Sequence, residues 1–312
     1  MKILFMGTPG FAAGILSAIV ERSRHEVTAV VTQPDRPKGR SARLAASPVK
    51  EYAKSHGIKV LQPERIKTEE ETAALYDIDA DIYVVAAFGQ ILSKEILSIP
   101  KKGCINVHAS LLPEYRGAAP IHRAIADGKE YTGVTIQQMN EGIDTGDIIT
   151  SVTVKIADDE TGESLFNKLM LAGEDLIIKT LDLIEEGKDT HTPQDESKAS
   201  YAKIMTKETG LVDFEKSAVS IERLCRALTP WPGTYTFLDG RMIKIKECKV
   251  GPSDTDRHPG EITDVTGDGI EVSCGEGTIV ITSLQAEGKR QMSAHDFLLG
   301  NKLSAGMRFG RL

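Results

Sequence analysis

An amide, an imidazole and a carboxylate occur where they could form one reactive cluster. Asn106 and His108 end an apolar run, two residues apart, and Asp144 lies in the glycine-rich stretch 140–147. Side chains two apart on a strand project to the same side. An amide donates hydrogen bonds to negative charge, and an imidazole donates or relays a proton. These residue types fit proton-transfer chemistry on a polar substrate, but their spacing alone leaves open that His108 is a structural histidine.

The elements that must position this cluster alternate between strand and helix. Strands are predicted at 2–7, 27–32, 59–61, 82–88 and 103–108, and helices at about 11–22, 49–56 and 118–126. Two further strands, at 133–139 and 148–154, precede a long amphipathic helix at 163–186. Such alternation predicts an α/β fold with a Rossmann-like, doubly wound and mostly parallel sheet, whose ligands bind outside the carboxyl ends of the strands.

The last third of the chain has a different pattern. Short β-like runs at 242–245, 261–265, 270–272 and 278–281 are separated by Gly and Asp turns, with one helix near 217–228. This pattern predicts a smaller, OB-like β-barrel. The polar stretch after Gly187 has no apolar period. We therefore expect domains at 1–187 and 205–312, joined by a linker at 188–204.

Several other classes of protein fit the sequence poorly. Pro9 occupies the second glycine position of a dinucleotide-binding turn, where it supplies no N–H for a phosphate. The four cysteines lie far apart without a C-x-x-C pair, so we expect buried, reduced thiols and no metal. No apolar run is long enough to span a bilayer, and we expect a cytoplasmic protein without membrane contact.

The net charge of −7 lies entirely in residues 1–200, since residues 201–312 hold 15 basic and 15 acidic groups. The overall field would not attract a polyanion. If the chain binds nucleic acid, it must do so through local basic patches.

Several segments together resemble the folate-dependent formyltransferases. They include the core block Gly103–His108 with Ser110–Pro113 and Arg116–Gly117, and the later Asp144–Asp147. The resemblance extends over the whole chain, since it also includes Gly7–Pro9, Gln33–Pro37, Gly89–Leu92 and Thr229–Gly233.

The resemblance implies transfer of a formyl group from 10-formyltetrahydrofolate to a primary amine, in the closest case the α-amine of methionyl initiator tRNA. The reaction needs stabilisation of a tetrahedral oxyanion and removal of a proton from the amine. Asn106 would donate to the oxyanion. Asp144 would orient His108, which would act as a donor or as a proton relay. The sequence leaves these two roles of His108 open.

Two loops resemble the segments of that family that contact folate. They are Ser110, Leu111, Leu112 and Pro113, and Phe88 with Gln90, Ile91 and Leu92. A flat pterin is best held by backbone groups near the sheet edge. For Leu111 and Leu112, plain core packing is the alternative.

The segment Gln33–Lys50 is basic, with only Asp35 as an acid, and we expect a long loop beside the active site. A solvated surface loop is the alternative. The resemblance implies that it contacts tRNA through Arg36, Lys38, Arg40 and Arg43. In the last domain, Arg241, Lys244, Lys246 and Lys249 could form a second face for the tRNA backbone.

Three rival functions remain at this stage. A small-molecule amine acceptor would not need the basic loop or the second domain. Hydrolysis of the formyl-folate would use the same site with water in place of the amine. A non-catalytic tRNA-binding protein would not need Asn106, His108 and Asp144 together. For any of these functions we expect a monomer.

Overall fold

The structure is a computed structural model that describes residues 1–38, 43–66, 69–252 and 256–310. The chain divides into two compact units. Unit 1 comprises residues 1–120, 131–155 and 166–202, and unit 2 comprises residues 121–130, 156–165 and 203–312. The second unit therefore includes two short stretches that interrupt the first unit in sequence.

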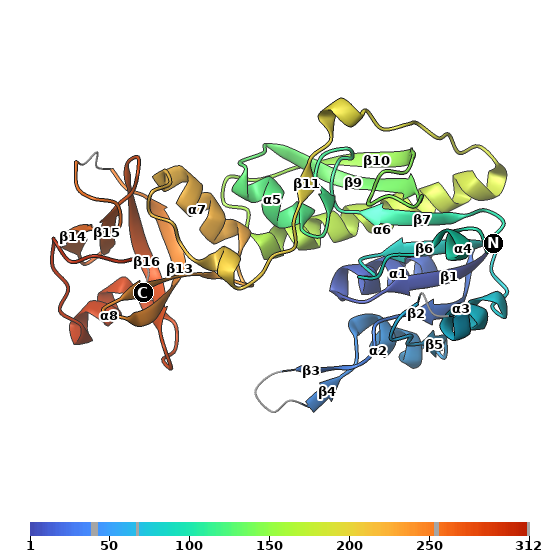
Figure 1. Cartoon of the computed structure of the whole chain (residues 1–312), viewed down its shortest axis with the longest axis horizontal. Coiled ribbons are helices and arrows are strands. Elements are labelled where there is room, and N and C mark those ends of the chain that lie inside the picture. The colour runs from blue at the N-terminus through green and yellow to red at the C-terminus, as the bar shows by residue number, and fades with distance from the viewer. Residues whose placement is uncertain (39–42, 67–68, 253–255, 311–312) are drawn as a thin grey trace. The chain divides into compact units, whose positions relative to one another are not determined.

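Unit 1 is built on a mixed sheet, which in its described residues has the strand order β10-β9-β7-β6-β1-β2-β5 (Figure 1). Strands β7, β6, β1, β2 and β5 are parallel to one another, whereas β9 and β10 run antiparallel to their neighbours. Their bounds are β1 Lys2–Gly7, β2 Glu26–Val31, β5 Lys59–Leu61, β6 Ile82–Ala86, β7 Cys104–His108, β9 Tyr131–Gln138 and β10 Ile148–Lys155. All five residues of β6 are buried, as expected for a strand covered on both faces.

Helices cover both faces of this sheet. On one face, α1 (Gly10–Arg22) packs against α6 (Gly162–Glu186), where the Phe11 and Phe166 rings lie 5.9 Å apart. On the other, α3 (Glu69–Tyr76) and α4 (Lys94–Leu97) cover a core that includes Leu4, Met6 and Tyr83. The remaining helix of this unit is α2 (Pro48–Ser55). The predicted doubly wound, mostly parallel fold is therefore confirmed.

Local signals set the ends of these helices. The Ser47 hydroxyl accepts a hydrogen bond from the Lys50 N–H at 3.1 Å, and Pro48 begins α2. A serine N-cap followed by proline at the first helical position is a strong start signal. Gly187, with φ of +64°, ends α6, since glycine adopts the left-handed conformation without a steric penalty.

Two segments expected to be irregular contain short strands. Residues 33–50 contain an antiparallel hairpin of β3 (Arg36–Lys38) and β4 (Arg43–Ala45), followed by the start of α2. The expected linker contains a 3-10 turn, η1 (Glu196–Lys198), and β11 (Tyr201–Ala202). This last strand pairs in parallel with β8 (Arg116–Gly117) of unit 1. Strands of two or three residues are too short to show a hydrophobic period.

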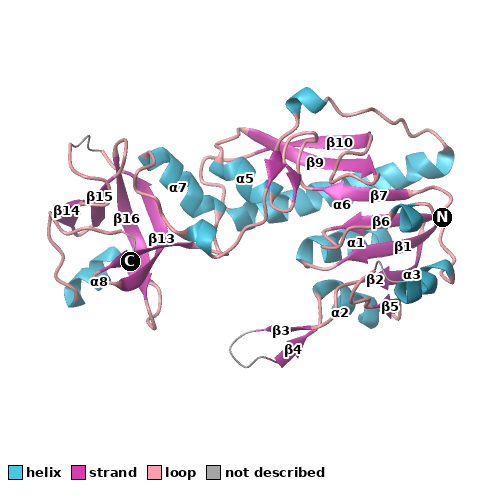
Figure 2. Ribbon diagram, viewed as in Figure 1, coloured by secondary structure: helices cyan, strands magenta, loops and turns pink. Residues whose placement is uncertain are grey.

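Unit 2 is centred on an antiparallel sheet, shown by the magenta arrows on the side of the C-terminus in Figure 2. Its strands are β12 Thr234–Leu238, β13 Arg241–Val250, β14 Ile262–Thr266, β15 Gly269–Ser273, β16 Thr278–Ala286 and β17 Met292–Ser293. Residues 308–310 connect the two edge strands of this sheet. Gly310 bridges to Phe237 in β12, and Arg308 bridges to Glu261, which directly precedes β14. The helices are α5 Pro120–Ala126, α7 Ala218–Ala227 and α8 Ala294–Gly300, and η2 (Glu208–Gly210) is a 3-10 turn. The predicted smaller β domain is confirmed.

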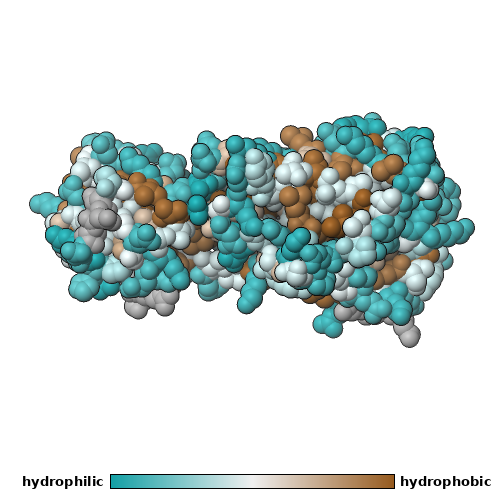
Figure 3. All heavy atoms as spheres, turned by 90° about the horizontal axis from the view of Figure 1, so that it is seen from above, coloured by the Kyte–Doolittle hydropathy of each residue, from teal (hydrophilic) through white to brown (hydrophobic). Residues whose placement is uncertain are grey.

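Hydrophobic side chains on the face shown in Figure 3 form separate groups among hydrophilic ones. The most exposed large ones over the whole surface include Leu44, Ile204 and Leu299. Scattered apolar side chains of this kind are normal on protein surfaces. Within the described residues, none of the helices has the length and apolar character needed to cross a bilayer.

Candidate active site

The sheet directs the loops of interest to one edge. Parallel β6 and β7 pair with Val85 opposite Asn106, so both strands end at the same side of the sheet. Strand β1 lies between β2 and β6, which is where the order of the strands reverses. Crevices outside the carboxyl ends of strands at such a switch point are the usual ligand sites of this class of fold.

Strand β7 places Asn106 and His108 on this edge. Asn106 is half-buried, and the His108 side chain is only 6% exposed. His108 Nε2 lies 2.9 Å from the carbonyl oxygen of Tyr115. Because a carbonyl can only accept, Nε2 carries a proton and donates it. The other ring nitrogen, Nδ1, faces Asp144 Oδ2 at 3.6 Å.

The Asp144 carboxylate joins the cluster. Its Oδ1 accepts hydrogen bonds from Asn106 Nδ2 at 3.1 Å and from Gln137 Nε2 at 2.8 Å, and its Oδ2 accepts from the Gly117 N–H at 2.8 Å. Three N–H donors fix both oxygens in space. The structure thus brings together the three residues singled out in the sequence, with Asp144 between the other two.

The loop that carries Asp144 has an unusual backbone. Asp144 has φ of +54°, a left-handed conformation that is uncommon outside glycine but tolerated by Asp. Two residues later, a Cβ on Gly146 would overlap the carbonyl oxygen of Gln138, so only glycine fits there. The glycines between β9 and β10 therefore permit the close turn that points the carboxylate back toward β7.

The segment Ser110–Pro113 begins shortly after the end of β7 and is held by hydrogen bonds within the protein. Ser110 is fully buried, and its hydroxyl donates to the Glu114 carbonyl at 2.6 Å. The Thr135 hydroxyl donates to the Ser110 carbonyl at 2.7 Å and accepts from the Leu112 N–H at 3.1 Å. Leu112 is buried, whereas Leu111 is half-buried against Gly133. Several of the backbone groups expected to serve folate are thus paired within the protein.

The second expected folate segment is partly buried. Phe88 and Leu92 belong to the core under α3 and α4, and Ile91 has 59% of its surface exposed. The Gln90 amide accepts from the Ile66 N–H at 3.0 Å and donates to the Pro63 carbonyl at 3.3 Å. Of these four residues, Ile91 offers the most side-chain surface to a ligand.

A cavity of about 540 Å³ lies beside this edge. It is lined by the loops after β1, β2 and β6 together with the hairpin, among them Thr8, Pro9, Gln33, Arg36, Phe88 and Gly89. One expected folate residue, Phe88, and one expected tRNA residue, Arg36, are therefore among the residues that line this cavity.

Of the expected tRNA residues, Arg36 and Lys38 lie in β3 and Arg43 lies in β4. Arg36 is exposed on β3, and the backbones of Lys38 and Arg43 pair across the hairpin. Arg40 lies outside the described residues. Lys50, from the same basic run, forms an ion pair with Asp35 at 2.7 Å, and this hydrogen-bonded ammonium lowers the pKa of the Asp35 carboxyl. The charge of Lys50 is therefore already balanced.

Four residues near the cluster were not assigned a role from the sequence, although Arg116 and Gly117 belong to the segments that carry the resemblance. Gln137 and Gly117 bond the Asp144 side chain, and Gln194 donates to the carbonyl oxygens of Asp144 and Gly146 at 2.9 and 2.6 Å. Arg116 in turn donates to the Gln194 side chain. Gln194 lies in the polar stretch taken as a linker, where no local pattern distinguishes it.

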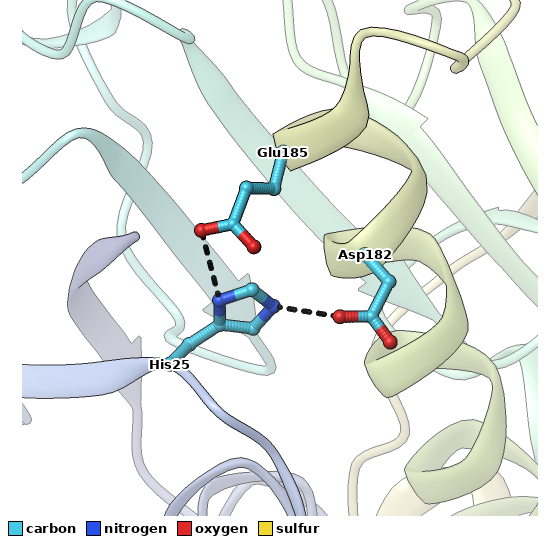
Figure 4. A group of neighbouring side chains, drawn as sticks. All are labelled: His25, Asp182 and Glu185. Carbon is cyan, nitrogen blue, oxygen red and sulfur yellow. Dashed lines mark ion pairs between the residues drawn. The ribbon is translucent and has the colours of Figure 1, made fainter.

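Among the described residues, a group that could hold a metal ion lies away from this edge and comprises His25, Asp182 and Glu185 (Figure 4). His25 Nε2 faces Asp182 at 3.3 Å, and Nδ1 faces Glu185 at 3.9 Å. The carboxylates thus lie beside opposite nitrogens of one ring, an arrangement that does not suit shared coordination of a single ion. Burial lowers the pKa of His25. We interpret the group as a link between the start of β2 and α6.

Comparisons with known proteins agree with this fold. Residues 1–181 match the family model described as formyl transferase, and residues 204–302 match its C-terminal domain. The chain is 48% identical to the methionyl-tRNA formyltransferase of Lachnospira eligens, over 99% of this chain and 100% of that one. It is also 48% identical to the methionyl-tRNA formyltransferase of Agathobacter rectalis, over 99% of both.

Solved structures with the same fold are more distant in sequence. A sugar 3N-formyl transferase, WlaRD, has a TM-score of 0.67 at 21% identity, covering 93% of this chain and 99% of that one. HypX from Aquifex aeolicus, in complex with tetrahydrofolic acid, has a TM-score of 0.64 at 17% identity, covering 98% of this chain and 50% of that one. At such identities the likeness concerns the fold alone.

The fold, the Asn–His–Asp cluster and the family match together define a one-carbon transferase. The chain belongs to the formyl transferase family and, by its end-to-end identity with them, to the methionyl-tRNA formyltransferases.

Proposed function

We propose that this enzyme transfers the formyl group of 10-formyltetrahydrofolate to the α-amino group of methionyl initiator tRNA, giving N-formylmethionyl-tRNA for translation initiation. The observation that carries the proposal is the cluster in which Asp144 accepts a hydrogen bond from Asn106 and lies 3.6 Å from His108, in a chain that matches methionyl-tRNA formyltransferases over its full length.

Asn106 would stabilise the transition state. Attack of the amine on the formyl carbon creates an oxyanion, which needs a donor already in place. The Asn106 amide has two N–H groups, and Asp144 accepts from this nitrogen at 3.1 Å. That bond fixes the plane of the amide and leaves its second N–H to the oxyanion.

His108 and Asp144 would carry the proton. Because Nε2 of His108 donates to the Tyr115 carbonyl, Nδ1 is the nitrogen able to gain or lose a proton. The amine loses one proton as its nitrogen bonds to the formyl carbon. The His108–Asp144 pair accepts that proton, and N10 of the folate receives a proton as the bond between N10 and the formyl carbon breaks. The geometry thus favours the relay role of His108 over direct donation to the oxyanion.

The donor would lie at the same edge. We propose that Ser110, Leu111, Leu112 and Pro113 on one side, and Phe88, Gln90, Ile91 and Leu92 on the other, form the folate site. Because many of these groups are buried or paired, their contribution would come mainly from shape, with Ile91 and Leu111 as the accessible side chains.

The acceptor would be held by basic groups. We propose that Arg36, Lys38, Arg40 and Arg43 contact the tRNA, since the hairpin adjoins the cavity at the switch point. Residues 205–312 would form a tRNA-binding domain, separated from the catalytic domain 1–187 by residues 188–204. In β13, Ile243 and Ile245 are buried while Lys244 is exposed and Lys246 half-buried, as expected for a basic outer face.

The decisive experiment is incubation with 10-formyltetrahydrofolate and methionyl initiator tRNA, scored for formyl-methionine. Small amines, such as an amino-sugar nucleotide, serve as competing acceptors. We expect formylation of the tRNA and little of the amines. Transfer only to small amines would overturn the proposed acceptor, and release of formate without transfer would indicate a hydrolase.

We further propose that the enzyme acts as a monomer in the cytoplasm, where its tRNA substrate is used. Light scattering during gel filtration should give the mass of one chain at all loading concentrations. A mass of two chains would refute the monomer.

A further inference from the structure

The segment Gln194–Ala202, here called the strap, lies against the residues that flank the cluster. Its last two residues form β11, which pairs in parallel with Arg116–Gly117. The Arg116 N–H donates to the Ser200 carbonyl at 2.8 Å, and the Tyr115 N–H donates to the Ser200 hydroxyl at 2.9 Å. The strap is therefore part of unit 1, although its composition is that of a linker.

Gln194 connects the strap to the Asp144 loop. Its Nε2 donates to the carbonyl oxygens of Asp144 and Gly146, at 2.9 and 2.6 Å. Its Oε1 accepts from Arg116 Nε at 3.1 Å and Nη2 at 2.8 Å. Both N–H groups and both lone pairs of the amide are thus used, and its orientation is set by donors on one side and acceptors on the other.

Arg116 forms the rigid support for this amide. Its side chain is fully buried, and it makes a two-pronged pair with Glu196, from Nη1 to Oε2 at 2.9 Å and from Nη2 to Oε1 at 2.6 Å. The hydrogen-bonded carboxylate raises the pKa of Arg116. A planar guanidinium held at both ends has little freedom to turn. Arg116 therefore fixes the orientation of the Gln194 amide, which in turn donates to the Asp144 loop.

The same support reaches both proton-handling residues. The Gly117 N–H bonds the Asp144 side chain at 2.8 Å, and the Tyr115 carbonyl accepts from His108 Nε2 at 2.9 Å. Gln194 holds the main chain of Asp144, whose φ of +54° needs such restraint. Gln194 thus holds the main chain of Asp144, while the neighbours of Arg116 hold the side chains of Asp144 and His108.

We propose that Gln194 is a positioning residue for formyl transfer, which keeps the Asp144 carboxylate between Asn106 and His108. This inference rests on the proposed function. Gln194 acts on the main chain of Asp144 and not on the substrate. Its loss should therefore slow the chemical step and leave substrate binding nearly intact.

Two variants test the inference. Gln194→Ala removes both sets of contacts, and Gln194→Glu keeps an acceptor for Arg116 but cannot donate to the two carbonyls. We expect both to lower kcat, by as much as about 10²-fold for a misplacement of about 1 Å, with little change in KM for tRNA or folate. Unchanged kcat, or a rise in KM alone, would overturn the proposal.

The control variant is Lys198→Ala, since Lys198 lies in the strap and its exposed ammonium forms an ion pair with the exposed Asp195. It should behave as the unmodified enzyme. Combining Gln194→Ala with Asp144→Asn should give an enzyme no slower than Asp144→Asn alone, because both changes act through one carboxylate. If the double variant is slower than Asp144→Asn by the full effect of Gln194→Ala, Gln194 acts elsewhere.

Hydrogen exchange, which does not depend on catalysis, separates this inference from the proposed function. The Gly117 N–H is protected by Asp144, so Gln194→Ala should speed its hydrogen exchange while the exchange of β6 amides stays slow. If the unmodified enzyme fails to formylate methionyl-tRNA, the proposed function fails, and the exchange rate still decides the positioning role. Unchanged exchange at Gly117 would refute that role.

Discussion

His108 Nδ1 lies 3.6 Å from Asp144 Oδ2, beyond the range of a good hydrogen bond, while the same oxygen accepts from the Gly117 N–H at 2.8 Å. The geometry of the two side chains is therefore set by the main chain around each of them. A small movement could bring Nδ1 into hydrogen-bond range. We expect the pair to exchange a proton with the bound amine.

Replacement of Asn106 by alanine should cut kcat by about 10²–10³-fold, the usual cost of removing one oxyanion donor. KM for both substrates should change little, because the oxyanion exists only in the transition state. Steady-state kinetics with methionyl-tRNA measure both constants. Because Asn106 also donates to Asp144, circular dichroism should confirm an intact fold. Near-normal kcat would remove Asn106 from the mechanism.

His108 and Asp144 should behave as one unit. We expect His108→Ala and Asp144→Ala each to lower kcat by orders of magnitude, and the double variant to be little worse than either single one. The single and double variants are compared under saturating substrates. A double variant as slow as the product of the two single effects would show that the residues act independently. A His108→Ala enzyme with near-normal turnover would refute the assignment altogether.

The sequence predicted the proximity of Asn106 and His108 because both lie on one strand. Asn106 and His108 share one side of β7, and the glycines around Asp144 marked a tight turn. Their proximity follows from the periodicity of strands and the sheet topology. Gln194 carried no such signal, since its partners lie about 50 and 80 residues away in sequence. Contacts of that range depend on tertiary packing, which local patterns do not encode.

Burial was harder to predict at the folate loops. Phe88 and Leu92 resemble ligand-contacting residues by position, yet their side chains fill the core beneath α3 and α4. An apolar residue at the end of a buried strand suits either role, and the sequence cannot show which side it faces. The hairpin of residues 36–45 was expected as a loop for a similar reason, since its two strands have three residues each.

Acid should weaken the contribution of Glu196 to stability. The hydrogen bond from Arg116 lowers the pKa of the Glu196 carboxyl below its usual 4.5. A depressed carboxyl pKa adds stability above the unfolded pKa, and this is lost as the pH falls through the folded pKa. The unmodified enzyme should therefore exceed Glu196→Gln in free energy of unfolding at neutral pH, and the difference should shrink below pH 4.5. Urea titrations at several pH values measure it, and a difference independent of pH would contradict the expectation.

The basic hairpin should contribute to the salt dependence of tRNA binding. If Arg36 and Arg40 each neutralise one tRNA phosphate, alanine at either position should raise KM for methionyl-tRNA and lower the slope of log affinity against log salt by about 1. The kcat should stay near normal, because neither residue belongs to the cluster of Asn106, His108 and Asp144. Lys188→Ala is a matched control, since Lys188 is an exposed cation paired with Glu186 outside the hairpin. KM for tRNA measured over a range of salt concentrations gives the slopes. Equal slopes for the control and the hairpin variants would exclude phosphate contacts by these two arginines.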